Sequence, residues 1–95
     1  MAKYRKKPIV IEAFQFKYLP ASPGQWPEWF LVAYRKDKGT EGSVYLHTNG
    51  LLVIWTLEGI LEISPEDFVI KGIKGELYPC KPDIFKATYE SVVEG

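Results

Sequence analysis

A glycine- and lysine-containing run at residues 71–75 is the segment whose composition most directly suggests chemistry. Glycines let backbone N–H groups approach a phosphate, and ammonium groups neutralise its charge. The run therefore predicts an anion site formed by Lys71, Gly72, Lys74 and Gly75. The alternative is a glycine-bearing turn with hydrated lysines, because short motifs of this kind have weak specificity.

Aromatic side chains and a basic opening segment accompany this run. Stacking on a base, together with a few cations on a phosphate, is a way to hold a nucleotide that needs no net positive charge. The predicted ligand-binding residues are Arg5, Lys6, Trp26, Lys71, Gly72, Lys74, Gly75, Tyr78 and Lys81. The alternative is that most aromatic rings, including those of Trp29, Trp55 and Tyr89, belong to the core or to an oligomer interface.

Few residues could catalyse a reaction. His47 is the only histidine, and the sequence gives it neither an orienting partner nor enough companions for a zinc site. Cys80 is interpreted as a small buried apolar residue, with activation of its thiol by Lys81 as the alternative. The acidic residues Glu58, Glu62, Glu66 and Asp67 fit hydrated turns and strand faces. We therefore predict a non-enzymatic protein with neither a metal nor a cofactor.

Composition restricts the partners. The 95 residues contain twelve Lys plus Arg and twelve Asp plus Glu, and this balance argues against duplex nucleic acid and favours self-association. A single cysteine excludes an internal disulfide and is compatible with a reducing cytosol. No apolar run reaches membrane-spanning length, and no signal-peptide core follows the basic start. We expect a homo-oligomer that is located in the cytosol of the host cell and has no membrane partner.

The elements that must position these residues can be predicted from periodicity. Residues 9–16 are β-branched and aromatic and predict a strand, central in its sheet because it is almost continuously apolar. Residues 18–25 read as a loop. Pro27 suits the first turn of a helix that ends before Gly39. Asn49-Gly50 predicts a hairpin between 44–48 and 51–56, and further strands follow at 60–63, 68–71 and 76–80.

A short closing helix is expected from Pro82 to Glu90. Without repeats or long linkers, residues 1–95 form one α+β domain. The predicted architecture is a small antiparallel meander sheet with one main helix packed on it and a short C-terminal helix.

Residues 4–16 and 57–89 resemble a family of small proteins encoded by tailed bacteriophages and prophages. The features that carry the resemblance are a Tyr-Arg-Lys-Lys-Pro start, a Glu-Ala-x-Gln strand, a Pro-x-Trp helix and the segment Lys71-Gly-x-x-Gly-Glu-x-Tyr-Pro-Cys-Lys-Pro-Asp-Ile-Phe85. One position departs from the pattern, because Glu66 stands where the family usually has glycine. If that glycine serves a positive-φ turn, the loop here should differ slightly.

The resemblance implies a phage accessory protein that acts by binding. Unrelated small phage proteins sequester the cyclic nucleotides of bacterial immune systems. By analogy with them, the leading hypothesis is a protein that sequesters a small phosphorylated ligand, namely a host cyclic (di)nucleotide signal. The alternative hypothesis is a protein-interaction or structural accessory module that binds a host or phage protein through an aromatic patch. An enzyme is disfavoured.

Overall fold

The computed structural model describes residues 2–5, 7–17 and 26–92. The elements within them follow the order β1 (Glu12–Gln15), α1 (Glu28–Arg35), β2 (Val44–Leu46), β3 (Leu52–Thr56), β4 (Gly59–Ile63), β5 (Phe68–Lys71), β6 (Leu77–Cys80) and α2 (Pro82–Thr88). The strand pairings are antiparallel. The predicted α+β class, with a main helix and a short C-terminal helix, is confirmed.

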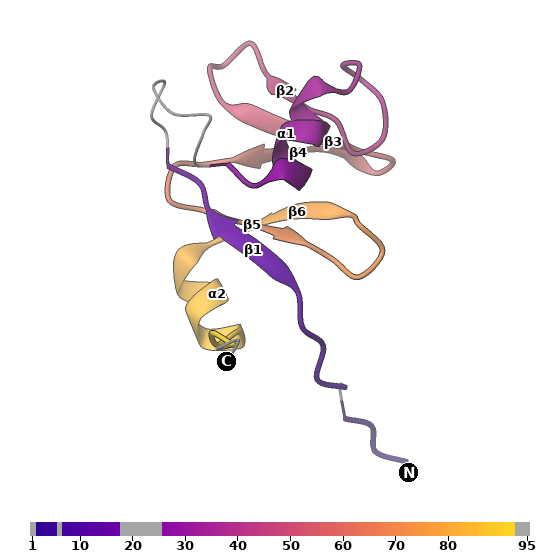
Figure 1. The fold of residues 1–95 in the computed structure, drawn as a ribbon, viewed down its shortest axis with the longest axis vertical. Coiled ribbons are helices and arrows are strands. Elements are labelled where there is room, and N and C mark those ends of the chain that lie inside the picture. The colour runs from indigo at the N-terminus through magenta and orange to yellow at the C-terminus, as the bar shows by residue number, and fades with distance from the viewer. Residues whose placement is uncertain (1, 6, 18–25, 93–95) are drawn as a thin grey trace.

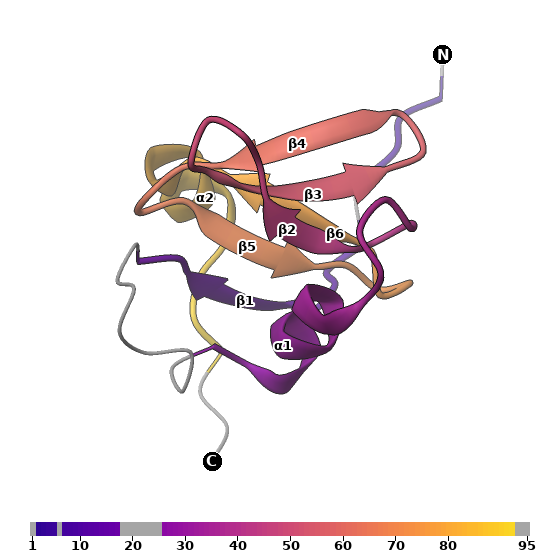
Figure 2. The ribbon, with the colours of Figure 1, turned by 90° about the horizontal axis from the view of Figure 1, so that it is seen from above.

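The strands divide into two three-stranded sheets (Figure 1). The order β2-β3-β4 follows the chain as a meander, whereas the order β1-β5-β6 joins the first strand to the last two. The chain passes from one sheet to the other at residues 64–67, where Pro65 lacks the N–H that a ladder needs. Figure 2 shows the two sheets layered with α1 beside them.

The prediction that the first strand is central is wrong, since β1 lies at the edge of its sheet. Its pairing with β5 begins at Glu12 opposite Lys71, and residues 7–11 continue outward without strand structure. The apolar character of residues 9–16 therefore has two sources. Phe14 and Phe16 face the core, whereas Ile9 and Val10 lie outside the sheet and are exposed.

The predicted Asn49-Gly50 hairpin joins β2 to β3, and a second hairpin joins β3 to β4. Gly50 has φ 86° and Gly59 has φ 130°, which are backbone conformations that favour glycine. The Asn49 side chain accepts a hydrogen bond from the Leu51 N–H at 3.0 Å and closes the turn between β2 and β3. The resulting register places Val44 opposite Ile54.

The main core lies between the two sheets and α1. Phe30 of α1 is fully buried, and its ring centroid lies 5.0 Å from those of Phe14 and Trp26. The buried residues of this cluster are Phe16, Phe30, Ala33, Val44, Leu52, Ile54, Ile63, Val69 and Leu77. Burial of this apolar surface is the main force that holds the sheets together.

The other face of the β1-β5-β6 sheet is covered by α2. The ring of Phe85 stacks on that of Phe68 with centroids 3.9 Å apart, and Tyr89 continues the stack at 5.0 Å. The antiparallel register sets Ala13, Ile70 and Tyr78 side by side on this face. Ile70 is buried, but α2 itself contains no buried residue. This face is therefore only partly covered.

No helix in the described part of the chain is long and apolar enough to cross a membrane.

Candidate functional site

The turn between β5 and β6 uses its own backbone groups internally. The Gly72 N–H donates to the Glu76 carbonyl oxygen at 2.8 Å, and the Gly75 N–H donates to the Gly72 carbonyl oxygen at 2.9 Å. The Lys74 N–H donates to the Glu76 side-chain oxygen Oε1 at 3.2 Å. A carboxylate of the same chain thus occupies the position predicted for a phosphate. A Cβ on Gly72 would overlap that carboxylate, so a larger residue there would displace the Glu76 side chain.

Two of the predicted phosphate-binding lysines form ion pairs. Lys71 Nζ lies 3.4 Å from Glu12 Oε2 on the surface. Lys81 Nζ donates to both carboxylate oxygens of Asp67, at 3.2 and 3.3 Å, and Asp67 is only 2% exposed. The Ser64 N–H donates to the same carboxylate at 2.9 Å. Lys81 therefore neutralises a buried charge of the loop that joins the sheets.

The other predicted site residues are scattered. Trp26 packs against the core cluster, with edge contacts to Phe30 and Tyr34, as the core alternative had it. Arg5 and Lys74 are exposed. Lys6 lies outside the described residues. Of the predicted set, Gly72 and Tyr78 line one cavity, and Lys71 and Gly75 line another, smaller one.

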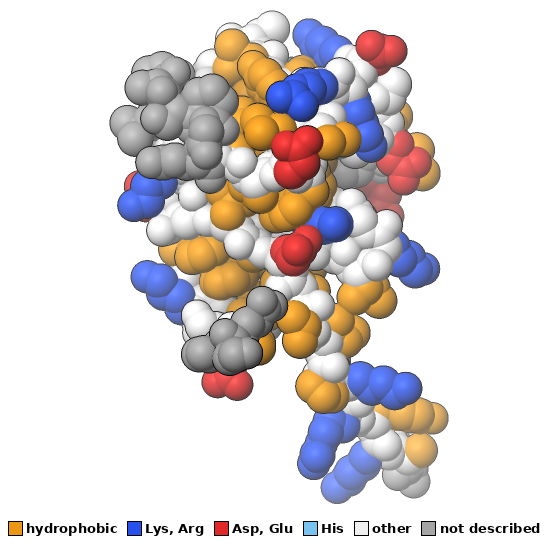
Figure 3. All heavy atoms as spheres, viewed as in Figure 1, with side chains coloured by type: hydrophobic (Ala, Val, Ile, Leu, Met, Phe, Trp, Pro, Cys, Tyr) orange, Lys and Arg blue, Asp and Glu red, His pale blue; other side chains and the backbone are white. Residues whose placement is uncertain are grey.

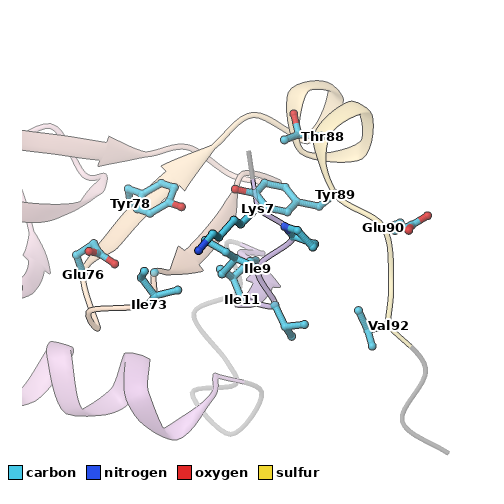
Figure 4. A pocket seen from close by; sticks show the side chains of 13 residues that line it. Lys7, Ile9, Ile11, Ile73, Glu76, Tyr78, Thr88, Tyr89, Glu90 and Val92 are labelled. Carbon is cyan, nitrogen blue, oxygen red and sulfur yellow. The ribbon is translucent and has the colours of Figure 1, made fainter. Parts of the chain in front are cut away.

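The cavity that Gly72 and Tyr78 line is a groove along residues 7–11, with a volume of about 720 Å³ (Figure 4). We call it the first groove. Its opposite walls are the β5–β6 turn and the chain that leaves α2. The lining residues are Lys7, Pro8, Ile9, Val10, Ile11, Gly72, Ile73, Glu76, Tyr78, Thr88, Tyr89, Glu90 and Val92.

A second groove of about 550 Å³ also borders residues 9–11. It extends along Glu12 and Ala13 and is bounded by Phe68, Phe85 and residues 89–92. Residues 9–11 therefore line two hollows. The two grooves together border the segment that continues β1 and the stacked rings of α2.

Tyr78 and Tyr89 form a polar pair within the apolar first groove. Figure 4 shows their hydroxyl groups directed toward each other, with Lys7 beside them. Burial, followed by the hydrogen bond and the charge of Tyr89, raises the pKa of Tyr78 to about 12. The Tyr78 hydroxyl therefore stays protonated at neutral pH, and the two rings can stack on a flat ligand.

Several apolar side chains of the first groove are exposed. Val10 is 74% exposed, Ile73 69% and Val92 62%. Carboxylates stand among them, because Glu76 and Glu90 line the same groove. Figure 3 shows the basic side chains of the N-terminal segment projecting from the body, next to apolar side chains. The groove is thus lined by exposed apolar side chains together with charges of both signs.

The residues considered for catalysis have no catalytic partners in the described chain. Among the described residues, the His47 ring has a hydrogen bond only with the neighbouring Thr48 hydroxyl, at 3.5 Å. Burial, then the charges of Asp67 and Asp83, raises the pKa of the Cys80 thiol, which keeps it protonated and a poor nucleophile at neutral pH. The described residues hold no group of three or more side chains placed to bind a metal.

The loop at residues 64–67 keeps the conformation of a glycine turn. Glu66 has φ 75°, a left-handed conformation that is costly for a residue with a side chain. The expectation that the loop differs from that of the resembling family stays a prediction, while in this chain Glu66 itself adopts the positive φ. Its N–H donates to the Phe16 carbonyl oxygen at 2.8 Å and its carbonyl oxygen accepts from the Gln15 side chain.

The sequence interpretation missed the apolar groove residues Ile9, Val10, Ile73 and Val92. Ile9 and Val10 were assigned to a central strand, and Ile73 lies between two lysines in a run that resembles a phosphate loop. The sequence carries no local signal for these residues, because their exposure follows from the β1–β5 pairing, which ends at Glu12 opposite Lys71.

No family model matches this sequence. No curated protein and no solved structure matches it either. The site is therefore interpreted from its own geometry.

Proposed function

We propose that this chain is a non-enzymatic protein-interaction module that binds an extended segment of a partner protein along residues 7–11. The observation that carries the proposal is the first groove, in which Val10, Ile73 and Val92 are all more than 60% exposed. Apolar patches with a polar rim mark interaction sites, because a monomer gains nothing from leaving them in water.

The proposal of an extended partner rests on the backbone. None of the hydrogen bonds among described residues uses the backbone of residues 7–11, and β1 lies at a sheet edge. Free N–H and C=O groups at such an edge can pair with an added strand, while pockets hold alternate side chains. A segment with an apolar residue at every second position fits both features.

The biological setting is also proposed from the sequence. The resemblance to a tailed-phage family supports a phage accessory protein, and the single cysteine supports the reducing cytosol of the host. The partner would then be a host or phage protein.

A peptide-display selection against the purified chain tests the proposal. We expect the selected peptides to have alternating apolar residues and to bind as extended strands. The substitution Ile73→Glu should weaken their binding at least tenfold, since it places a charge in the apolar groove. Fluorescence anisotropy of a labelled peptide measures the affinity.

Leu57→Glu is the matched control. Leu57 is 75% exposed, close to Ile73 at 69%, but it lies in the β3–β4 turn and does not line either groove. Binding should be unchanged in this variant. Peptides that bind equally well to wild type and Ile73→Glu, or no selected peptide at all, would contradict the proposal.

The second candidate function is sequestration of a cyclic nucleotide, and the placement of Tyr78 and Tyr89 beside Lys7 favours it. Aromatic faces could stack on bases while the ammonium group neutralises a phosphate. Glu76 and Glu90 oppose it, because they place negative charge in the same groove.

Thermal unfolding with a panel of cyclic di- and trinucleotides tests this candidate. A sequestering protein should gain melting temperature and release intact nucleotide after heating. Lys7→Glu should abolish the shift if the first groove binds the ligand, and Lys74→Glu should abolish it if the 71–75 turn does. Lys38→Glu is the control, because Lys38 lies over the Tyr45 ring, outside both grooves. No shift with any nucleotide rules out this candidate for that panel.

A further inference from the structure

Residues 7–15 form one extended segment whose two halves have different surroundings. Residues 12–15 are β1 and pair with β5 on one side, whereas residues 7–11 run on beyond the end of β5 (Figure 1). The hydrogen-bonding edge on the side away from β5 is therefore continuous along the whole segment. Val10, 74% exposed, lies near its middle.

The charge of the chain is divided between this segment and the body. Residues 1–7 contain four cations, Lys3, Arg5, Lys6 and Lys7, and no acidic residue. The chain has twelve cations and twelve carboxylates, so the remaining residues hold 12 − 4 = 8 cations against 12 carboxylates, a net charge of −4. A basic end and an acidic body in one chain attract each other between copies.

We propose that the extended segment bound by this chain is the N-terminal segment of a second copy, so that two copies pair their residues 7–13 as antiparallel edge strands with Val10 at the two-fold axis. This inference rests on the proposed function and names its partner. A closed pair of identical chains uses the same surface on both, and identical strands related by a two-fold axis run antiparallel. The two β1-β5-β6 sheets would then form one continuous sheet across the dimer.

The pairing also fills the grooves. A two-fold axis perpendicular to the sheet keeps the α2-covered faces of both copies on the same side. Ile9 and Ile11 alternate with Val10 along the strand. The exposed apolar residues of one copy therefore lie against the grooves of the other. Lys7 of the second copy comes alongside Ala13, where Glu90 lines the second groove.

Sedimentation equilibrium of the full chain tests the inference. We expect a concentration-dependent dimer that weakens as salt rises, because a basic segment contacts an acidic body. Val10→Asp should weaken dimerisation at least tenfold, since the two-fold axis brings two new carboxylates together. Leu57→Asp, at a matched exposure of 75%, should not. Circular dichroism confirms that both variants stay folded.

A charge exchange sharpens the test. Lys7→Glu should weaken the dimer, and adding Glu90→Lys in the same chain should restore it, because the two positions meet across the interface. A Lys7→Glu effect that Glu90→Lys does not restore contradicts the predicted docking.

The remaining outcomes separate this inference from the proposed function. A monomer at every concentration that still binds selected peptides at Ile73 overturns the dimer and leaves the interaction module standing. A monomer that binds none overturns both. A dimer that saturating selected peptide does not dissociate overturns the inference, because peptide and second copy would then use different surfaces. Binding of the monomer to anionic vesicles or to single-stranded DNA would assign the basic segment to another partner and equally overturn it.

Discussion

The two faces of the β1-β5-β6 sheet differ in how completely they are covered. The inner face meets α1 and the other sheet, and Val69 there is fully buried. The outer face meets α2, a helix without a buried residue, and leaves two grooves that residues 9–11 line. The difference indicates that the inner face maintains the fold, whereas the outer face is available for binding.

The largest expected loss of stability comes from a substitution on the inner face. Phe30→Ala removes a fully buried ring that contacts Phe14, Trp26 and Trp29, and should lower the free energy of unfolding by about 3–5 kcal/mol. Urea denaturation measures it. If that variant does not fold, Phe30→Leu gives a smaller loss on the same scale. A loss below that of Phe85→Ala would reverse the comparison.

The next largest loss of stability is expected at the loop of residues 64–67, which joins the two sheets. Asp67→Asn removes the charge that accepts from Lys81 and from the Ser64 N–H, and should cost about 1–3 kcal/mol of unfolding free energy. Lys81→Met should also destabilise, because it leaves the buried carboxylate without its cation. The control is Asp83→Asn at an exposed position. If Lys81→Met leaves stability unchanged, the ion pair has no structural role.

The outer face should respond locally. Phe85→Ala removes the ring stacked on Phe68 and should cost about 1–2 kcal/mol. Hydrogen exchange should show faster opening of α2 while the amides of β3 keep their protection, because α2 contributes little to the main core. Equal loss of protection in both elements would show that the two faces unfold as one unit.

The tyrosine pair gives the outer face a pH dependence. The pKa of Tyr78 is raised from 10.0 to about 12, so the folded state favours its neutral hydroxyl. Its contribution to stability is fully present below about pH 10 and is lost as pH rises toward about 12. Tyrosinate absorbance should show one late-titrating tyrosine. That component should disappear in Tyr78→Phe and persist in Tyr4→Phe, where the ring is 94% exposed.

The smallest expected effect lies at the loop between the sheets. Glu66→Gly should raise the free energy of unfolding by about 0.5–1 kcal/mol, because it relieves a left-handed conformation at φ 75°. Urea denaturation measures the gain. Pro65→Gly is the contrasting change, since it only loosens the unfolded chain and should destabilise.

Turn and helix-start residues predicted the hairpin and the two helices, because these elements depend on neighbouring residues. Asn49-Gly50 specified its hairpin, and Pro27 and Pro82 preceded or opened the helices near their observed starts. What they could not predict was the division into two sheets. The pairing of β1 with β5 joins residues more than fifty positions apart, and the pattern of residues 9–16 does not contain it.

The candidate site was predictable only in part. Gly72 and Tyr78 do line the first groove, but Lys71 and Lys81 are in ion pairs with Glu12 and Asp67. Composition shows that lysines and glycines are present, yet it does not show which carboxylates they meet. The groove residues were hidden for a related reason. An exposed isoleucine and a buried one look alike in the sequence.

The Glu76 carboxylate accepts a hydrogen bond from the Lys74 N–H and so competes with any other anion for the β5–β6 turn. A tethered group acts at an effective concentration on the order of millimolar or above, whereas a free anion in the cell must displace it from solution. The Glu76 carboxylate therefore occupies the Lys74 N–H in advance, and a free anion would have to displace it. Only a ligand that binds there much more tightly than a carboxylate, or a partner that first draws Glu76 away, would gain access to those amides.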